Sequence, residues 1–270
     1  MTATNVVVGA ASGMGAAVAR ELSKRNGRLV VADRNLDGTK ALAAELGANT
    51  EAIECDVTDA EHVAALVKAV GSDVGALVIT AGLSPTMANG RRIFEVNLIA
   101  MTRVLDAFEP SVSATTAAVC FASVAGHSVP DMAPLNAILD EPLAPDFFDK
   151  IAALGMDPDD PGTGYGVSKK GVLRLVERYA LRWGPKGGRI MSLSPGIIDT
   201  PMGRQEAEQQ PVMAQIVAMS PINRFAAAEE VAAVAAFLTS PAASFMTGSD
   251  VLVDGGFVAA SHAAAAPVGQ

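Results

Sequence analysis

The sequence is short of cysteine and of positive charge, and both shortages limit what the protein can do. Its two cysteines, Cys55 and Cys120, stand alone in apolar runs that favour strands, without the spacing of metal ligands. We therefore expect two buried thiols in a reducing compartment, no disulfide and no metal site. Lys and Arg number 20 against 29 Asp and Glu, which gives a net charge of −9. This balance lacks the basic footprint that nucleic acids and anionic membranes require, so neither is expected as a partner.

Long apolar runs are also missing. No run approaches the length that spans a membrane, and the first residues lack the basic region, apolar block and cleavage site of a secretion signal. The chain has 270 residues, half of them hydrophobic, and no linker rich in Pro, Gly and Ser divides it into two differently composed halves. We expect one cytoplasmic domain over residues 1–260 and a flexible tail over residues 261–270.

The first half of the chain alternates β-branched apolar runs with stretches rich in Ala, Leu and Glu that have helical periodicity. Uninterrupted apolar strands are buried on both faces, and strand–helix alternation implies right-handed crossovers and a parallel sheet. With two later runs, the pattern predicts a single α/β domain built on a seven-stranded, doubly wound parallel sheet, with its ligand at the carboxyl ends of the strands. The expected strands are Val6–Val8, Leu29–Val31, Ala52–Glu54, Leu77–Ile79, Ala118–Phe121, Arg189–Leu193 and Asp250–Val253, and the expected helices are Gly13–Arg25, Asp37–Leu46, Asp59–Val70, Arg91–Phe108, Tyr165–Trp183 and Glu229–Leu238.

The turn between the first expected strand and the first helix runs from Gly9 to Gly15 with the spacing G-x-x-x-G-x-G. Glycines here let the backbone bend sharply and let a pyrophosphate approach the N–H groups at the start of the helix. A turn of this kind can also serve only to redirect the chain. Its place after the first strand and before the first helix favours dinucleotide binding.

Asp33 ends the second expected strand, 18 residues after Gly15 (33 − 15). A carboxylate there can accept a hydrogen bond from the adenosine ribose and repels a 2′-phosphate. Alternatively, Asp33 caps the turn that follows it. Arg34 favours NADP instead, because an Arg can accommodate the 2′-phosphate of NADP. The pattern favours NAD over NADP.

Tyr165 and Lys169 are four positions apart in a helical stretch, so their side chains share one face of the helix. A free phenol has a pKa of about 10, and a nearby ammonium lowers it toward the range where proton transfer is efficient. On its own, the pair fits a surface Tyr and a solvated Lys better, since short motifs often match by accident.

Further blocks follow in order along nearly the whole chain. They are Asp56-Val57, Thr80-Ala81-Gly82, Asn97, Ser123, Pro195–Thr200 and Asp254-Gly255-Gly256. With the glycine turn and the Tyr165–Lys169 pair, this set resembles the short-chain dehydrogenase/reductase family, of the single-domain, or classical, type. The resemblance implies a Rossmann fold and an enzyme that moves a hydride between a secondary alcohol or ketone and C4 of a nicotinamide, with NAD favoured over NADP.

Two features depart from the family pattern. Thr80 stands where the family usually has Asn, which removes a loop-stabilising hydrogen bond unless the hydroxyl replaces it. Ser123 and Tyr165 are 42 positions apart (165 − 123), far more than is usual, so residues 127–163 form an insertion before the Tyr165 helix. The insertion and the runs Thr80–Pro85 and Ser240–Ser244 most resemble the bacterial 3α-hydroxysteroid dehydrogenase/carbonyl reductase branch.

The resemblance implies that Tyr165 exchanges a proton with the substrate oxygen, that Lys169 lowers the Tyr165 pKa and holds the nicotinamide ribose, and that Ser123 hydrogen-bonds the carbonyl oxygen. Asn97 would hold a water that links Lys169 to solvent. Taken singly, Ser123 also fits a strand-end hydroxyl, Asn97 a polar residue inside a helix, and Asp56 and Thr200 helix caps. The expected cofactor contacts are Gly9, Ser12, Gly13, Met14, Gly15, Asp33, Arg34, Asp56, Val57, Thr80, Ala81, Gly82, Tyr165, Lys169, Pro195, Gly196, Ile198 and Thr200.

The insertion and the stretch Met202–Ile222 are expected to wall the substrate. Their many apolar side chains argue against disorder and predict a partly helical lid over an apolar pocket, suited to a cyclic or steroid-like ketone. The same side chains alternatively form a subunit interface in a homodimer or homotetramer. His127 has no nucleophile pattern around it and fits a loop or a pocket wall. The apolar residues are Met132, Leu135, Ile138, Leu139, Leu143, Phe147, Phe148, Ile151, Leu154 and Met156 in the insertion, and Met202, Met213, Ile216, Val217 and Met219 beyond it.

Two other functions compete with the NAD-dependent oxidoreductase. A regulatory protein that binds the dinucleotide without turnover need not keep Ser123, Tyr165 and Lys169, so their presence disfavours it. An isomerase or dehydratase on the same fold is usually longer, with a separate C-terminal substrate domain of which the sequence shows no sign.

Overall fold

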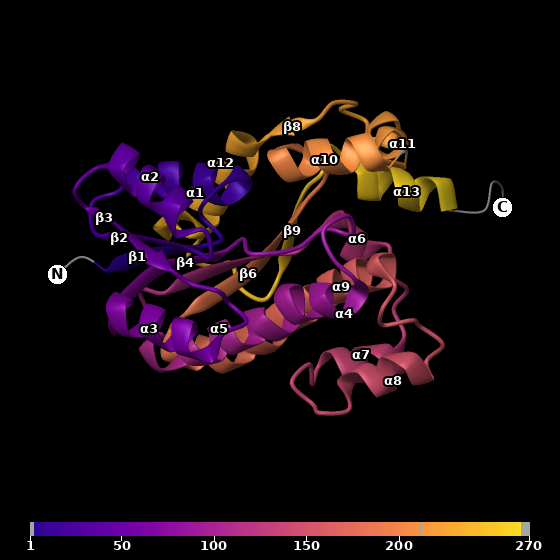
Figure 1. The fold of residues 1–270 in the computed structure, drawn as a ribbon, viewed down its shortest axis with the longest axis horizontal. Helices are drawn as coiled ribbons and strands as arrows, with labels where there is room; N and C mark the ends of the chain where they lie inside the picture. Colours follow the sequence, from indigo (N-terminus) through magenta and orange to yellow (C-terminus); the bar gives the residue numbers. More distant parts are fainter. Residues whose placement is uncertain (1–2, 211, 266–270) are drawn as a thin grey trace.

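Seven parallel strands form the central sheet, in the order β3-β2-β1-β4-β5-β6-β9 (Figure 1). The computed structural model describes residues 3–210 and 212–265. All seven expected strands are present, most of them a few residues longer than the apolar runs that predicted them, which confirms the doubly wound parallel sheet. The strands are β1 (Thr4–Val8), β2 (Leu29–Asp33), β3 (Thr50–Glu54), β4 (Val74–Ile79), β5 (Ala117–Phe121), β6 (Arg189–Pro195) and β9 (Asp250–Val253), and a separate parallel pair is formed by β7 (Ile198–Asp199) and β8 (Ala226–Ala227).

Helices cover both faces of the sheet, because the strands send alternate side chains into two apolar clusters. Val6 and Val8 of β1 belong to the cluster covered by α3, α5 and α9, while Val7 belongs to the one covered by α1, α2 and α12 (Figure 1). All three valines are fully buried, as uninterrupted apolar strands predict. These helices are α1 (Gly13–Ser23), α2 (Leu36–Leu46), α3 (Ala60–Val70), α5 (Met101–Phe108), α9 (Pro161–Trp183) and α12 (Ala228–Leu238), with short 3-10 turns at Glu109–Ser111, Gly184–Lys186 and Pro241–Ala243.

The helix expected over Arg91–Phe108 runs from Gly90 to Phe108 in three parts. These are α4 (Gly90–Phe94), a π-helical stretch (Glu95–Ala100) and α5. Asn97 lies in the π-helical stretch and is fully buried. Its side-chain amide accepts a hydrogen bond from the Leu83 N–H at 2.7 Å and donates one to the Leu83 carbonyl at 3.0 Å. The side chain therefore fixes the loop that follows β4 to this helix.

The helix α9 begins at Pro161, four residues before Tyr165. Asp160 caps it by accepting a hydrogen bond from the Thr163 N–H at 2.7 Å, and Pro161 occupies the first helical position, where its missing N–H costs nothing. The start of the helix is therefore set by residues that precede the Tyr165–Lys169 pair.

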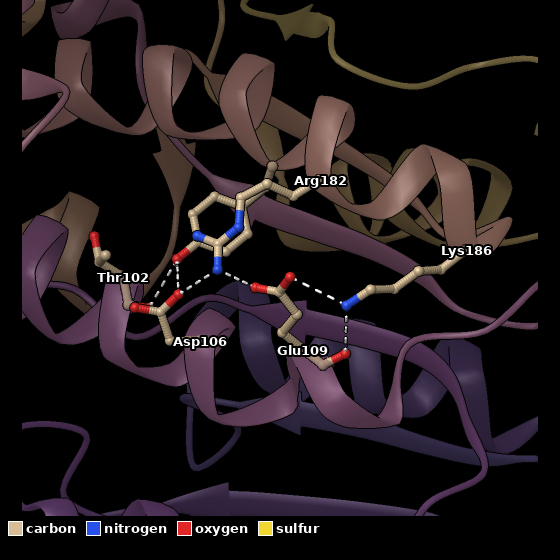
Figure 2. A network of polar contacts seen from close by, with 6 residues as sticks. Thr102, Asp106, Glu109, Arg182 and Lys186 are labelled. Carbon is tan, nitrogen blue, oxygen red and sulfur yellow. Dashed lines mark hydrogen bonds and ion pairs between the residues drawn. The ribbon is translucent and has the colours of Figure 1, made fainter.

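The other end of α9 is tied to α5 by the polar network of Figure 2. Asp106 of α5 accepts hydrogen bonds from Tyr179 and Arg182, and Glu109 pairs with Arg182 and Lys186. Together with the buried face of the helix, this network fixes the position of the element that carries Tyr165 and Lys169.

The insertion forms two short helices, α7 (Ala133–Leu139) and α8 (Phe147–Ala153), after the four-residue helix α6 (Val124–His127). Its apolar side chains pack onto α4 and α9. The Phe147 ring meets the Phe94 ring edge-on with centroids 5.5 Å apart, and Leu139 is fully buried. Arg174 of α9 donates two hydrogen bonds to Asp140 at 2.8 and 2.7 Å. In Figure 1, α7 and α8 lie beside α9 and α4, on the opposite side of the molecule from α10 (Pro201–Gln209) and α11 (Val212–Met219).

The last described helix, α13 (Phe257–Ala265), extends into the segment that was expected to form a tail. Residues 261–265 continue this helix, because the alanine-rich sequence favours helical backbone. The Ser261 hydroxyl also donates a hydrogen bond to the Phe257 carbonyl at 2.9 Å. The rest of the expected tail, residues 266–270, lies outside the described residues.

Candidate active site

A cleft lies at the carboxyl ends of the strands, where a doubly wound sheet places its ligand. Residues that follow β1 to β6 line it, together with side chains from α9, α10 and α11. Every residue expected to contact the cofactor is part of this lining. They are Gly9, Ser12, Gly13, Met14, Gly15, Asp33, Arg34, Asp56, Val57, Thr80, Ala81, Gly82, Tyr165, Lys169, Pro195, Gly196, Ile198 and Thr200.

Two glycines of the first turn are required by close backbone approach. Gly9 has a φ of +91°, and a Cβ there would lie 2.4 Å from the Ala81 nitrogen. A Cβ on Gly15 would lie 2.0 Å from the Gly9 carbonyl oxygen. Any side chain at either position would therefore push the start of α1 away from the β4 loop and deform the cleft floor.

Thr80, which stands where the resemblance implied Asn, forms hydrogen bonds of its own to the end of β1. Its hydroxyl lies 3.0 Å from the Val8 carbonyl oxygen and 2.9 Å from that of Gly9. The loop after β4 is thereby attached to the end of β1. The threonine hydroxyl therefore holds the two cleft-forming loops together.

The N-terminus of α1 is open toward the cleft. Ser12 occupies the N-cap position without forming a side-chain capping bond, whereas Asp59, Asn89, Asp160 and Thr200 all cap their helices. The first N–H groups of α1 are thus left for a ligand, and the helix dipole favours a negative charge there. This arrangement fits the pyrophosphate of a dinucleotide.

Asp33 fulfils its alternative role as a turn cap and also lines the cleft. Its carboxylate accepts hydrogen bonds from the Ala11 N–H at 3.1 Å and from the Asn35 N–H at 2.9 Å. A carboxylate offers about four acceptor positions, so capacity remains for a ribose hydroxyl. Arg34 lines the cleft beside it.

Of the two residues that alternatively cap helices, Thr200 does so and Asp56 does not. Asp56 accepts hydrogen bonds from the Thr58 N–H at 2.9 Å and the Thr58 hydroxyl at 2.7 Å, while Asp59 caps α3. Thr200 does cap α10, since its Oγ1 accepts a hydrogen bond from the Gly203 N–H at 3.0 Å. The hydroxyl proton of Thr200 is still available for a ligand.

Ser123, Tyr165 and Lys169 meet at one end of the cleft. Lys169 is 5% exposed, its Nζ donates a hydrogen bond to the Phe121 carbonyl at 2.8 Å, and it lies 5.8 Å from the centroid of the Tyr165 ring. Ser123 is also buried, and its Oγ accepts a hydrogen bond from the Ala125 N–H at 3.2 Å. The helical spacing of four therefore brings both α9 side chains to the serine that follows β5.

The proton affinities of this group differ from the expectation that Lys169 lowers the Tyr165 pKa. Burial raises the pKa of Tyr165 to about 12, the Ser123 hydroxyl acts in the opposite direction, and the Glu206 carboxylate raises the pKa further. Burial also lowers the pKa of Lys169 to about 8. The loss of water around both groups outweighs the effect of one on the other.

Asn97 lies behind the cleft and is not part of its lining. Both ends of its amide are bonded to the Leu83 backbone, as described above. Its Oδ1 would lie 3.3 Å from a Cβ on Gly82, and the Lys169 Nζ would lie 3.6 Å from the same point. Asn97 thus lies near Lys169, and its side chain supports the loop between them.

The insertion does not contribute to the cleft, which corrects the expectation that it forms a lid over the pocket. The lining includes none of residues 127–163. The apolar periodicity predicted burial, but the buried side chains face α4 and α9. His127, at the end of α6, is likewise not part of the lining, and its Nε2 lies 2.8 Å from the carboxylate of Asp250 at the start of β9. Of the second stretch, Met202 and Met213 line the cleft, whereas Ile216, Val217 and Met219 are not part of its lining.

Sequence reasoning missed Glu206, which lines the cleft from α10. It stands four positions after Met202, so the two side chains share one face of the helix. This signal could have been found had a helix been expected over Pro201–Gln209. The lining also includes Leu83, Met87, Arg92 and Val96, which the sequence analysis did not single out.

Within residues 3–210 and 212–265, no helix combines the length and hydropathy needed to cross a bilayer. In the same part of the chain, no group of three His, Cys, Asp or Glu side chains is arranged to hold a metal ion.

Comparisons with known proteins identify the family. A family model described as short chain dehydrogenase matches residues 3–134, and one described as Enoyl-(Acyl carrier protein) reductase matches residues 152–258. The chain is 32% identical to cis-4-hydroxycyclohexanecarboxylate dehydrogenase of Sinomonas cyclohexanicum, over 94% of this chain and 96% of that protein. The chain therefore belongs to the short-chain dehydrogenase/reductase family, whose members are oxidoreductases that bind NAD or NADP.

Two further relatives bear on the branch and on the fold. The chain is 32% identical to 3-alpha-hydroxysteroid dehydrogenase/carbonyl reductase of Comamonas testosteroni, over 77% of this chain and 87% of that protein, in agreement with the branch that the motifs resembled. A solved structure described as ribose-5-phosphate isomerase from Brucella melitensis 16M has a TM-score of 0.77 and 27% identity, and the match covers 100% of this chain and 98% of that one.

Proposed function

We propose that this protein transfers a hydride between NAD and a secondary alcohol or ketone. The observation that carries the proposal is that Ser123, Tyr165 and Lys169 line the same cleft as the glycine turn at the open N-terminus of α1. A nicotinamide bound there would supply the hydride-accepting and hydride-donating carbon. The residues of the chain would hold the dinucleotide, orient the substrate and move one proton.

Tyr165 is proposed to exchange that proton with the substrate oxygen. Its pKa of about 12 keeps the phenol protonated at neutral pH, as a proton donor in ketone reduction must be. Ser123 would donate a hydrogen bond to the same oxygen as negative charge develops on it. Lys169 would hold the nicotinamide ribose, and Asn97 would hold a water near Lys169 in the path to solvent.

NAD is the proposed cofactor because Asp33 lines the adenosine end of the cleft. Its carboxylate can accept a hydrogen bond from the ribose 2′-hydroxyl and would repel a 2′-phosphate. Arg34, beside it, would be the contact for NADP. Asp56 and Val57 would flank the adenine, and Ile198 and Thr200 would contact the nicotinamide.

The proposed substrate is an apolar cyclic ketone or alcohol. The cleft that Tyr165 lines has apolar walls formed by Leu83, Met87, Val96, Met202 and Met213. Such walls stabilise a ring by burial of its apolar surface. A relative that is named for a hydroxycyclohexane substrate and another that is named for a hydroxysteroid support this choice. A cytoplasmic setting and assembly as a homodimer or homotetramer complete the proposal.

A panel of cyclohexanones and steroid ketones, assayed separately with NADH and NADPH, tests the function. We expect ketone-dependent oxidation of NADH, and faster turnover with NADH than with NADPH. Tight cofactor binding without oxidation of either cofactor across the panel would instead favour a regulatory dinucleotide-binding protein. Conversion of a sugar phosphate with no net change in NADH would favour an isomerase.

A further inference from the structure

Glu206 is an acidic side chain in an otherwise largely apolar substrate end of the cleft. It extends from α10 into the lining that includes Ser123, Tyr165 and Lys169, and Met202 and Met213 lie on the same side. It is partly buried. The proton-transfer scheme above gives Glu206 no role.

The surroundings of Glu206 do not balance its charge fully. Burial raises the pKa of Glu206, while a hydrogen bond from the Ser84 hydroxyl and the charge of Lys169 act in the opposite direction. The Ser84 Oγ lies 3.0 Å from the Thr86 Oγ1, so the two hydroxyls form a chain that ends at the carboxylate. A carboxylate removed from water without enough partners is costly, and Lys169 would turn to the cofactor ribose once a dinucleotide binds.

A carboxylate has about four acceptor positions, of which the Ser84 hydroxyl can occupy one. Glu206 lines the same cleft as Ser123 and Tyr165, and its charge acts to raise the pKa of both Tyr165 and Lys169, so a substrate held by these groups would lie within reach of the carboxylate. We propose that Glu206 selects substrates that carry a second polar hydrogen, on a hydroxyl or a protonated amine, next to the reacting carbon. This inference rests on the proposed function and names its substrate class more closely.

The proposal has a direct consequence for substrates that lack the group. When a buried acceptor is left without a partner, the site rejects the analogue more strongly than a difference in apolar contact would. A vicinal diol or amino alcohol on a ring would fill the apolar walls and satisfy Glu206 together. A plain cyclic alcohol would fill the walls alone.

The experiment compares three alcohols on one ring: cyclohexanol, cyclohexane-1,2-diol and 2-aminocyclohexanol. NAD reduction by the wild-type enzyme and by Glu206→Ala and Glu206→Gln is measured as kcat/KM, with a pH profile for each. Glu208→Gln is the matched control, because Glu208 is an exposed carboxylate on α10 outside the cleft lining. We expect the wild type to prefer the diol or the amino alcohol to cyclohexanol by about 10-fold or more.

In Glu206→Ala this preference should be lost, with kcat/KM for the preferred substrate lowered about 10- to 100-fold and that for cyclohexanol changed less than about threefold. Glu206→Gln separates the two sources. If an ammonium is recognised, Glu206→Gln should lower kcat/KM selectively for the amino alcohol. If a hydroxyl is recognised, the variant should keep part of the preference for the diol. The control should keep the wild-type preference.

Two results would overturn the inference while leaving the proposed function intact. One is turnover of cyclohexanol by the wild type with no preference for either substituted ring. The other is an equal loss for all three substrates in Glu206→Ala with a shifted pH profile, which would assign Glu206 to proton transfer. No turnover of any alcohol or ketone by wild-type enzyme that binds NADH would refute both the proposed function and this inference.

Discussion

Burial sets the proton affinities of the two side chains that α9 brings to the cleft. It raises the pKa of Tyr165 to about 12 and lowers that of Lys169 to about 8. An ammonium at 5% exposure costs free energy in the folded protein, and the hydrogen bond to the Phe121 carbonyl offsets only part of that cost. The site holds Lys169 in a state that a bound anion or polar ligand would relieve.

The lowered pKa of Lys169 makes stability depend on pH in a defined direction. Below about pH 8 the amine is protonated in both the folded and the unfolded chain. Between about pH 8 and pH 10 the unfolded chain still binds the proton that the folded protein has lost, so the contribution of Lys169 to the free energy of unfolding rises with pH. Urea denaturation at a series of pH values should show this rise as a growing difference in the free energy of unfolding between the wild type and Lys169→Met, up to about 3 kcal/mol.

A difference between the two proteins that stays constant from pH 8 to pH 10 would refute the buried-amine account. The comparison with Lys169→Met removes the opposite contribution of the Cys55 and Cys120 thiols, whose pKa values are raised to about 12 and which lower stability above about pH 9 in both proteins. The range ends at pH 10, because the raised pKa of Tyr165 also lowers stability above it.

Asp33 should discriminate between the two dinucleotides. Asp33→Ala removes an acceptor for the ribose hydroxyl and the charge that opposes a 2′-phosphate, so NAD affinity should fall about 10- to 100-fold while NADP affinity stays or improves. Titration of each cofactor by fluorescence measures both. Asp33→Asn is the control, because its side-chain oxygen can still accept a hydrogen bond from Ala11 or Asn35. Equal losses for NAD and NADP in both variants would mean that Asp33 only shapes the turn.

At the scale of elements, the insertion stabilises the fold and leaves the cleft to α10 and α11. Phe147 and Leu139 are buried against α4 and α9, and the cleft lining contains no insertion residue. The second stretch of apolar residues behaves differently, since Met202 and Met213 do reach the cleft. Changes in substrate preference should therefore arise from α10 and α11.

Phe147→Ala separates the two roles. It removes a buried ring and leaves a cavity, so the free energy of unfolding should fall by about 3–5 kcal/mol. The kcat/KM of the folded fraction should change less than about twofold, because the cleft lining is untouched. Leu143→Ala, at a side chain 46% exposed in the same insertion, should alter neither quantity measurably. A large rise in KM with unchanged stability in Phe147→Ala would instead show that the insertion acts as a lid over the cleft.

At the scale of the whole molecule, the seven strands and the cofactor end of the cleft could be predicted from the sequence. Apolar runs such as Val6–Val8 specify strands buried on both faces, and the motif residues follow those strands, so parallel topology gathers them at one edge of the sheet. The thiols of Cys55 and Cys120 are buried, as their apolar surroundings predicted.

The rest depends on tertiary contacts that local patterns do not contain. Periodic apolar residues in the insertion indicate that Leu139 and Phe147 are buried but not which surface covers them. The polar stretch over Pro201–Gln209 has little apolar periodicity, so neither α10 nor the approach of Glu206 to the cleft was expected. The opposing pKa shifts of Tyr165 and Lys169 follow from burial. A spacing of four residues predicts that the two side chains are neighbours on a helix, but not that they are buried.

The central claim is that the phenol of Tyr165 transfers the proton in a cleft that also binds a nicotinamide. Tyr165→Phe removes one oxygen and keeps the ring. The most direct measurement is NADH binding and ketone-dependent NADH oxidation on the same preparation of this variant. We predict that binding stays within about threefold of the wild type and that turnover falls by at least about 100-fold. Turnover close to that of the wild type would contradict the account.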